Sequence, residues 1–115
     1  MRIWIRLVAV ILICVVRSTT AQDMPITQVL IDGEGWELVG EGYGFTEGPA
    51  VDVEGNVFFS DPTNHRIYRA GLDGTVTLFA ENTEKASGLM FGPDGRLYGC
   101  CRIGKRIAVW NKDGS

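Results

Sequence analysis

Four side chains that suit a hydrolytic or metal site stand within twenty residues of one another: Glu47, Asp52, Asp61 and His65. Glu47 follows Thr46 and precedes Gly48-Pro49, so its carboxylate stands where an apolar, strand-like run is about to begin. A carboxylate can ligate a divalent cation, and with a suitable partner it can act as a general acid or base. Forty residues later Ser87-Gly88 takes the place of Glu47-Gly48, without the charge.

The other three side chains have simpler interpretations. Asp52 is expected in the innermost strand and Asp61 at the end of the next strand, and both are predicted to be turn or strand-end hydrogen-bond acceptors. His65 is the only histidine and falls in a turn, which favours a solvated loop residue. A serine nucleophile paired with it would lack the Gly-x-Ser-x-Gly elbow. The position of Glu47 alone leaves open a metal ligand or an ordinary loop acid.

A repeat of forty residues determines where these side chains lie. Residues 36–75 align with residues 76–115 without a gap and share eight identities. Gly48 falls on Gly88, Gly55 on Gly95, and Glu47 on Ser87. A fixed period of about 40–45 residues is typical of a propeller blade. Residues 47 and 87 should therefore occupy the same position in successive blades, where the innermost strands converge around a channel.

Each period contains short runs rich in Val, Ile, Phe and Tyr. Strands are predicted at 50–53, 57–60, 66–70 and 76–80, and again near Phe91, at 97–101 and at 107–110. Asp-Gly and similar pairs between the runs favour tight hairpin turns. The predicted fold class is all-β, with four-stranded antiparallel blades arranged radially. A plain β-sandwich is the alternative, but it does not account for the ungapped repeat.

The first 21 residues read as a signal peptide that precedes the domain at 22–115. Arg2 and Arg6 precede an apolar run, and small residues end at Ala21. The run is too short for a stable membrane anchor, so we expect a secreted or periplasmic protein. Three of the eleven basic residues fall in this leader, which leaves eight against fourteen acidic residues. Such dispersed acidity argues against nucleic-acid binding.

Two further pairs of residues are interpreted as structural. Cys100 and Cys101 are adjacent on a predicted strand, so their side chains should point to opposite faces and pack as buried or half-buried residues. A strained disulfide between them is the alternative in an exported protein. Arg66 and Arg106 repeat at the start of a strand, which indicates pairing with an acid of a neighbouring blade.

The residues resemble a known family. Residues 46–49, 52–61 and 64–69 resemble the first blade of the gluconolactonase family, which includes regucalcin (senescence marker protein), and residues 86–98 resemble its second blade. The resemblance implies a six-bladed β-propeller of which this chain is the amino-terminal portion, with about two blades at 36–75 and 76–115. It also implies a divalent metal, calcium or zinc, in the central channel, and hydrolysis of sugar lactones as small-molecule substrates.

The resemblance assigns residue roles only in part. Glu47 matches the family's first metal ligand, and Ser87 stands where many relatives carry asparagine, which makes it a candidate substrate-binding residue. The family's other ligands, an asparagine pair and an aspartate also proposed as the base, have no counterpart here. No catalytic residue is therefore assigned, and the chain is expected to be a fragment that is inactive alone and self-associates through open blade faces. A non-catalytic propeller that binds a partner is the alternative.

Overall fold

The computed structural model describes residues 31–115, so the expected signal peptide at 1–21 lies outside the described residues. The chain divides into two units, Met1–Gly35 and Trp36–Ser115. All strands found within residues 31–115 belong to the second unit. Within residues 31–115, no helix has the length and apolar character needed to cross a membrane.

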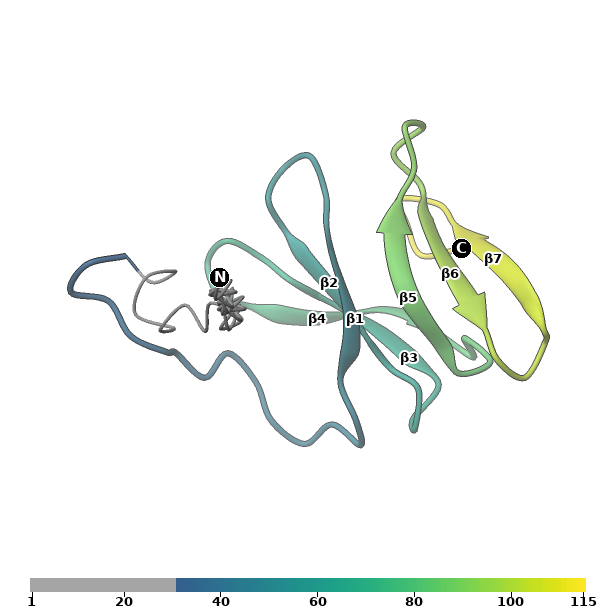
Figure 1. Cartoon of the computed structure of the whole chain (residues 1–115), viewed down its shortest axis with the longest axis horizontal. Helices are drawn as coiled ribbons and strands as arrows, with labels where there is room; N and C mark the ends of the chain where they lie inside the picture. Colours follow the sequence, from purple (N-terminus) through teal and green to yellow (C-terminus); the bar gives the residue numbers. More distant parts are fainter. Residues whose placement is uncertain (1–30) are drawn as a thin grey trace, which may run out of the picture. The chain divides into compact units, whose positions relative to one another are not determined.

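The described part of the chain contains seven strands in two antiparallel sheets (Figure 1). The first sheet has the order β1-β2-β3-β4 and the second β5-β6-β7. The strands are β1 Glu47–Val51, β2 Val57–Asp61, β3 Arg66–Ala70, β4 Val76–Glu81, β5 Ala86–Phe91, β6 Leu97–Cys101 and β7 Arg106–Trp110. Within each sheet, strands that follow one another in sequence pair through short turns, as expected for a meander. The predicted all-β fold with a four-stranded antiparallel sheet is confirmed.

The innermost strand differs from its prediction at both ends. It runs from Glu47 to Val51 instead of from 50 to 53, because Gly48 and Pro49 lie in a bulge and not in a turn before the strand. The pairing shifts register between Glu47 and Ala50. At the other end, Asp52 has already entered the turn. Glu47 is therefore the first strand residue, paired with Ser60, and not a loop residue.

The forty-residue repeat is present in the backbone itself. Glu47 pairs with Ser60, and Ser87 pairs with Cys100, each partner forty residues further along. The bulge after Glu47 recurs after Ser87. Positive φ angles recur at the same spacing, in the pairs Gly48 and Gly88, Gly55 and Gly95, His65 and Lys105, and Gly74 and Gly114. Two sheets with the same register, bulge and turns are successive copies of one structural unit.

The core lies between the sheets. Phe58 of β2 makes edge-to-face contacts with Phe79 of β4 and Phe91 of β5, at ring-centroid distances of 4.9 and 5.0 Å. Ile67 of β3 and Leu97 of β6 are almost completely buried. Residues from both sheets thus share one apolar cluster, so the second sheet covers one face of the first.

The predictions for Cys100 and Cys101, and for Arg66 and Arg106, are confirmed only in part. Cys101 is buried and Cys100 is exposed, which matches opposite faces of a strand, but the predicted burial is confirmed only for Cys101 and is wrong for Cys100. Both are free, so the alternative of a disulfide between them is wrong. Arg66 does form an ion pair, at 3.3 Å, but with Glu81 of its own sheet and not with a neighbouring blade, because β4 lies beside β3. Arg106 pairs at 3.2 Å with Glu84, in the connection between the sheets.

Candidate functional site

Glu47 lies where the two inner strands meet. It is half-buried at the start of β1, and Gly48 follows it with φ of 60°. A methyl group added to Gly48 would stand 2.8 Å from the backbone nitrogen of Gly88, the residue that follows Ser87 at the start of β5. Only glycine permits this approach. Glu47 and Ser87 therefore precede two glycines whose backbones are in contact, which agrees with the predicted convergence of the inner strands.

Two buried polar residues at the end of β2 hold the chain around Glu47. Ser60 donates its hydroxyl proton to the backbone oxygen of Glu47, with an O–O distance of 3.0 Å. Asp61 accepts hydrogen bonds from the backbone nitrogens of Gly44 at 2.9 Å and Phe45 at 3.2 Å. Both polar side chains are fully buried. We call Ser60 and Asp61 together the β2 clamp. Asp61 holds the backbone that precedes Glu47, and Ser60 holds the backbone of Glu47 itself.

Asp61 is ionised within this clamp. Burial by itself would raise the pKa of its carboxyl, but the hydrogen bonds from Gly44, Asn64 and Phe45 outweigh burial and lower the pKa below its ordinary value. Asn64 contributes both its backbone nitrogen at 3.2 Å and its side-chain nitrogen at 2.7 Å. The prediction of a strand-end acceptor is confirmed for Asp61. Sequence reasoning missed its bonds to Gly44 and Phe45, which lie 17 and 16 residues away, respectively.

Backbone strain gathers at the same end of the sheets as Glu47. Positive φ angles at residues other than glycine occur, within residues 31–115, in the three connections at this end: His65, Asn82, Glu84, Lys85 and Lys105. The turns at the other end use glycine at Gly55, Gly74, Gly95 and Gly114. Non-glycine residues in this region are strained, and such residues cluster at functional sites. The end that carries Glu47 is the better candidate for function.

The remaining predicted residues lie as follows. Asp52 closes the β1–β2 turn, where it accepts bonds from the backbone nitrogens of Glu54 and Asn56 and, at 2.7 Å, from the Asn56 side chain. Burial opposes ionisation of Asp52, but these bonds lower its pKa. Its prediction as a turn residue is confirmed, and it lies at the far end of β1 from Glu47. His65 lies in a turn, as predicted, but it is half-buried and not fully solvated. Ser87 is half-buried at the start of β5.

The hollows of the strand-bearing unit include a smaller and a larger one. The smaller, of about 390 Å³, lies beside Ser87 and is lined also by Cys100 and the cationic side chains of Arg102, Lys105 and Arg106. The larger, of about 1010 Å³, lies between the sheets at the glycine-turn end, against Phe58, Phe79 and Phe91. The larger hollow is therefore remote from Glu47, and its apolar walls continue the core. The smaller hollow adjoins Ser87, whereas the larger is lined in part by Asp52.

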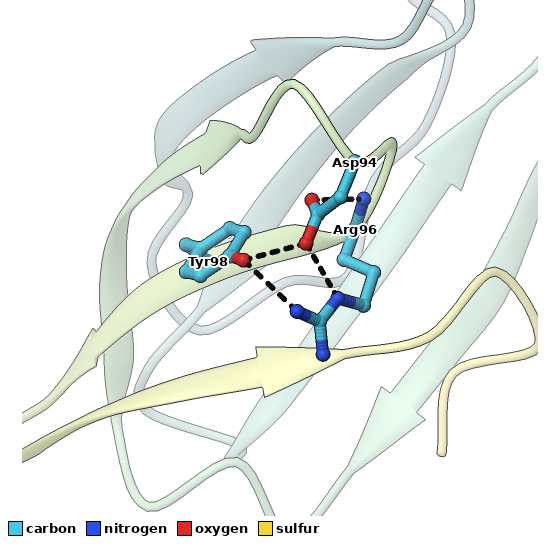
Figure 2. Close-up of polar contacts among 3 residues, drawn as sticks. All are labelled: Asp94, Arg96 and Tyr98. Atoms are coloured by element: carbon cyan, nitrogen blue, oxygen red, sulfur yellow. Dashed lines mark hydrogen bonds and ion pairs between the residues drawn. The ribbon is translucent and has the colours of Figure 1, made fainter.

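A further polar cluster caps the β5–β6 turn (Figure 2). Asp94 accepts hydrogen bonds from the Tyr98 hydroxyl at 2.8 Å and from Nε of Arg96 at 2.7 Å. The bond from Tyr98, followed by that from Arg96, lowers the pKa of Asp94 to about 2. These side chains are solvent-accessible and distant from Glu47, so the cluster stabilises the turn rather than forming part of the candidate site.

Glu47 does not have the partners of a complete metal centre. Within residues 31–115, no three His, Cys, Asp or Glu side chains are grouped so as to hold a metal ion. Calcium takes about 6–8 oxygen ligands and zinc about four ligands, so the residues present do not make up a site for either. The described residues therefore supply at most one metal ligand, Glu47.

Comparisons with known proteins agree with this geometry. Neither a protein-family model nor a curated protein matches the chain. Its structure is similar to that of a gluconolactonase from Xanthomonas campestris, with TM-score 0.63 and 24% identity over 67% of this chain and 26% of that one. It is also similar to virginiamycin B lyase from Staphylococcus aureus, with TM-score 0.53 and 22% identity over 58% of this chain and 24% of the lyase.

A third solved structure, of a presumed gluconolactonase, has TM-score 0.50 and 20% identity over 67% of this chain and 31% of that one. The two sheets are blades of a β-propeller. The predicted resemblance to gluconolactonases is thus confirmed for the fold. The chain spans about a quarter to a third of the length of these structures, which corresponds to about two blades.

Proposed function

We propose that this chain supplies one wall of a gluconolactonase-type propeller that hydrolyses sugar lactones with a divalent metal, calcium or zinc. The observation that carries the proposal is the placement of Glu47, at the contact between the two inner strands and fixed by the β2 clamp. The similarity to the Xanthomonas campestris gluconolactonase supports it. We also propose that the protein is exported, as the basic and apolar leader indicates.

The chemistry explains why one acid at this position matters. A lactone is a cyclic ester, and its hydrolysis needs a polarised carbonyl, a water molecule in reach and a base that takes the proton of the water. A Glu47 side chain held in one backbone geometry suits the role of a fixed oxygen ligand, because less ordering is required when the other ligands assemble. The remaining ligands and the base must come from outside the described residues, so we expect the separate chain to be inactive.

A chimera tests this proposal. Residues 36–115 would replace the aligned quarter of the Xanthomonas campestris gluconolactonase, and turnover of a gluconolactone would be followed by acid release. The chimera should hydrolyse the lactone, and Glu47→Gln should reduce kcat/KM at least about a hundredfold, in the range for loss of a group that acts on the transition state. Glu54→Gln is the matched control, since Glu54 is an exposed acid at the other end of β1.

A chimera that melts normally and keeps its rate after Glu47→Gln would overturn the proposal. The alternative is a propeller that binds a sugar or a partner without hydrolysis. The similarity to a lyase favours keeping this alternative, because the same blades occur in a propeller of a different activity. This alternative would be supported if the folded chimera binds the lactone but does not hydrolyse it, either with or without metal.

A further inference from the structure

The two sheets differ in charge at the end that carries Glu47. The forty-residue register allows them to be compared position by position. The β2–β3 turn of the first sheet has Pro62 and His65, where the β6–β7 turn of the second sheet has Arg102 and Lys105. Because proline and histidine serve in the first turn, the fold requires no cation at either position. The charges of Arg102 and Lys105 are therefore available for a role other than folding.

The backbone of the β6–β7 turn is fixed. His65 and Lys105 have φ angles of 56° and 48°, so the two turns share one unusual conformation. The first turn adopts it in a four-stranded sheet and the second in a three-stranded sheet, so a fourth strand is not needed for it. The backbone nitrogen of Ile103 donates to the backbone oxygen of Glu84 at 3.1 Å, which ties the turn to the β4–β5 connection. Strained positions such as Lys105 cluster at functional sites.

The charges of Arg102 and Lys105 are not neutralised within the described part of the chain. The three ion pairs found between residues 31 and 115 include neither of them, and both side chains are exposed. The acid of the adjoining connection, Glu84, is already paired with Arg106 at 3.2 Å. The whole chain has 14 acidic and 11 basic residues, so two such cations in one turn make this end of the second sheet locally positive.

The smaller hollow, of about 390 Å³, lies beside this turn. Ser87, Arg102 and Lys105 are among the residues that line it. Ser87 stands at the start of β5, next to the contact between the two inner strands, so a group bound there would lie beside the second inner strand, while Glu47 is held on the first. Arginine presents a planar set of N–H donors that suits a carboxylate or a phosphate, lysine adds a compact positive charge, and serine adds a hydroxyl donor.

We propose that the hollow beside Ser87 binds an anionic group of the substrate, a carboxylate or a phosphate, through Arg102 and Lys105. The proposal rests on the lactone hydrolysis proposed above, and it narrows the substrate class to sugar lactones that carry an acidic substituent. The lactone ring would lie toward Glu47 and the charged substituent in the hollow. The two cations would also offset the repulsion that an anionic ligand meets from Glu47 and from the acidic chain as a whole.

Kinetics of the gluconolactonase chimera test the substrate class. Gluconolactone would be compared with its 6-phosphate, and with a lactone of glucaric acid, which carries a carboxylate. For one of the two anionic lactones kcat/KM should be about tenfold or more above that for gluconolactone, the size expected from a hydrogen bond to a charged group. The double variant Arg102→Gln with Lys105→Gln should remove this preference. Arg69→Gln with Lys112→Gln is the matched control and should keep it, because both are exposed cations toward the glycine-turn end.

Calorimetry with inorganic phosphate and with acetate tests the anion site without catalysis. The purified chain should bind one of the two anions, and which one it binds distinguishes a phosphate from a carboxylate. The double variant, shown to be folded by circular dichroism, should bind that anion about tenfold or more weakly, and added salt should weaken binding to the wild type. If the chain binds the anion in this way but the chimera hydrolyses no lactone, the anion site stands and the proposed function is wrong. Equal anion binding by the double variant, no binding of either anion, or equal kcat/KM for neutral and anionic lactones would overturn the proposal.

Discussion

Replacement of Asp61 by asparagine should destabilise the protein more than any other exchange of aspartate for asparagine in the described chain. Asp61 is fully buried and accepts four hydrogen bonds, from Gly44, Phe45 and twice from Asn64. Asparagine keeps the shape of the side chain but loses its charge. Its amide nitrogen would place a hydrogen-bond donor against the N–H donors of Gly44, Phe45 and Asn64. The β2 clamp would then no longer hold the chain that leads to Glu47.

The size of the effect follows from these bonds. A hydrogen bond to a charged group contributes about 1.5–3 kcal/mol. Gly44, Phe45 and Asn64 are exposed, so water can replace part of what their donors lose. We therefore expect the free energy of unfolding to fall by about 2–4 kcal/mol, less than the sum over four bonds. For a domain of this size, that change lowers the Tm by about 10 °C or more.

Urea unfolding at a fixed protein concentration measures this change, and hydrogen exchange locates it. The amides of Gly44 and Phe45 should exchange faster in Asp61→Asn, while the amide of Ile67 in the core should change less. Asp73→Asn is the control, because Asp73 is exposed and accepts one bond from Thr75, at 3.0 Å. If the two variants unfold at the same urea concentration, the reasoning about the clamp is refuted.

The role of Asp61 also predicts that the stability of the protein depends on pH. The pKa of Asp61 is lower in the folded protein than its ordinary value of 3.8. Its contribution to stability is therefore present above about pH 4 and is lost as the pH falls through the folded pKa. The wild-type protein should lose stability in that acidic range. Asp61→Asn should lack this component, and a parallel loss in both proteins would contradict the assignment.

Three further predictions concern the turns and the core. Gly48→Ala should cost at least about 1 kcal/mol more than Gly74→Ala in urea unfolding, because both have positive φ but only Gly48 stands against the Gly88 backbone. Equal costs would refute the close approach of the inner strands. Tyr98→Phe should raise the pKa of Asp94 from about 2 toward 3.8 in an NMR titration, and an unchanged midpoint would contradict the bond shown in Figure 2. Ile67→Ala should destabilise by about 2–5 kcal/mol, and a loss below 1 kcal/mol would contradict its burial.

Local rules were sufficient for most of the fold. The Asp-Gly pairs, the alternation of Val, Ile, Phe and Tyr, and the spacing of glycines predicted strands that match β2, β3, β4, β6 and β7 to within about a residue. Repetition added information that a single strand does not carry. It placed Glu47 and Ser87 in equivalent positions, and the contact between Gly48 and Gly88 agrees with that placement.

The candidate site could be predicted only in part, because the residues that hydrogen-bond to one another around Glu47 are distant in sequence. The innermost strand was predicted to begin only at residue 50, yet the positive φ of Gly48 is used in a bulge inside β1. Ser60-Asp61 showed one detectable signal, two polar residues that end an apolar strand, but no local rule connects Asp61 to Gly44 and Phe45. Arg66 was assigned to a neighbouring blade for the same reason, since its partner depends on the pairing of β3 with β4.

Metal titration by calorimetry tests the central claim, that Glu47 is the metal ligand that this chain contributes. Calcium and zinc would be titrated into the gluconolactonase chimera and into its Glu47→Gln and Glu54→Gln variants, with circular dichroism to confirm that each is folded. The account predicts that Glu47→Gln weakens binding of the metal at least about tenfold, equal to about 1.4 kcal/mol, and that Glu54→Gln leaves it unchanged. Equal metal affinity in a folded Glu47→Gln chimera would contradict it.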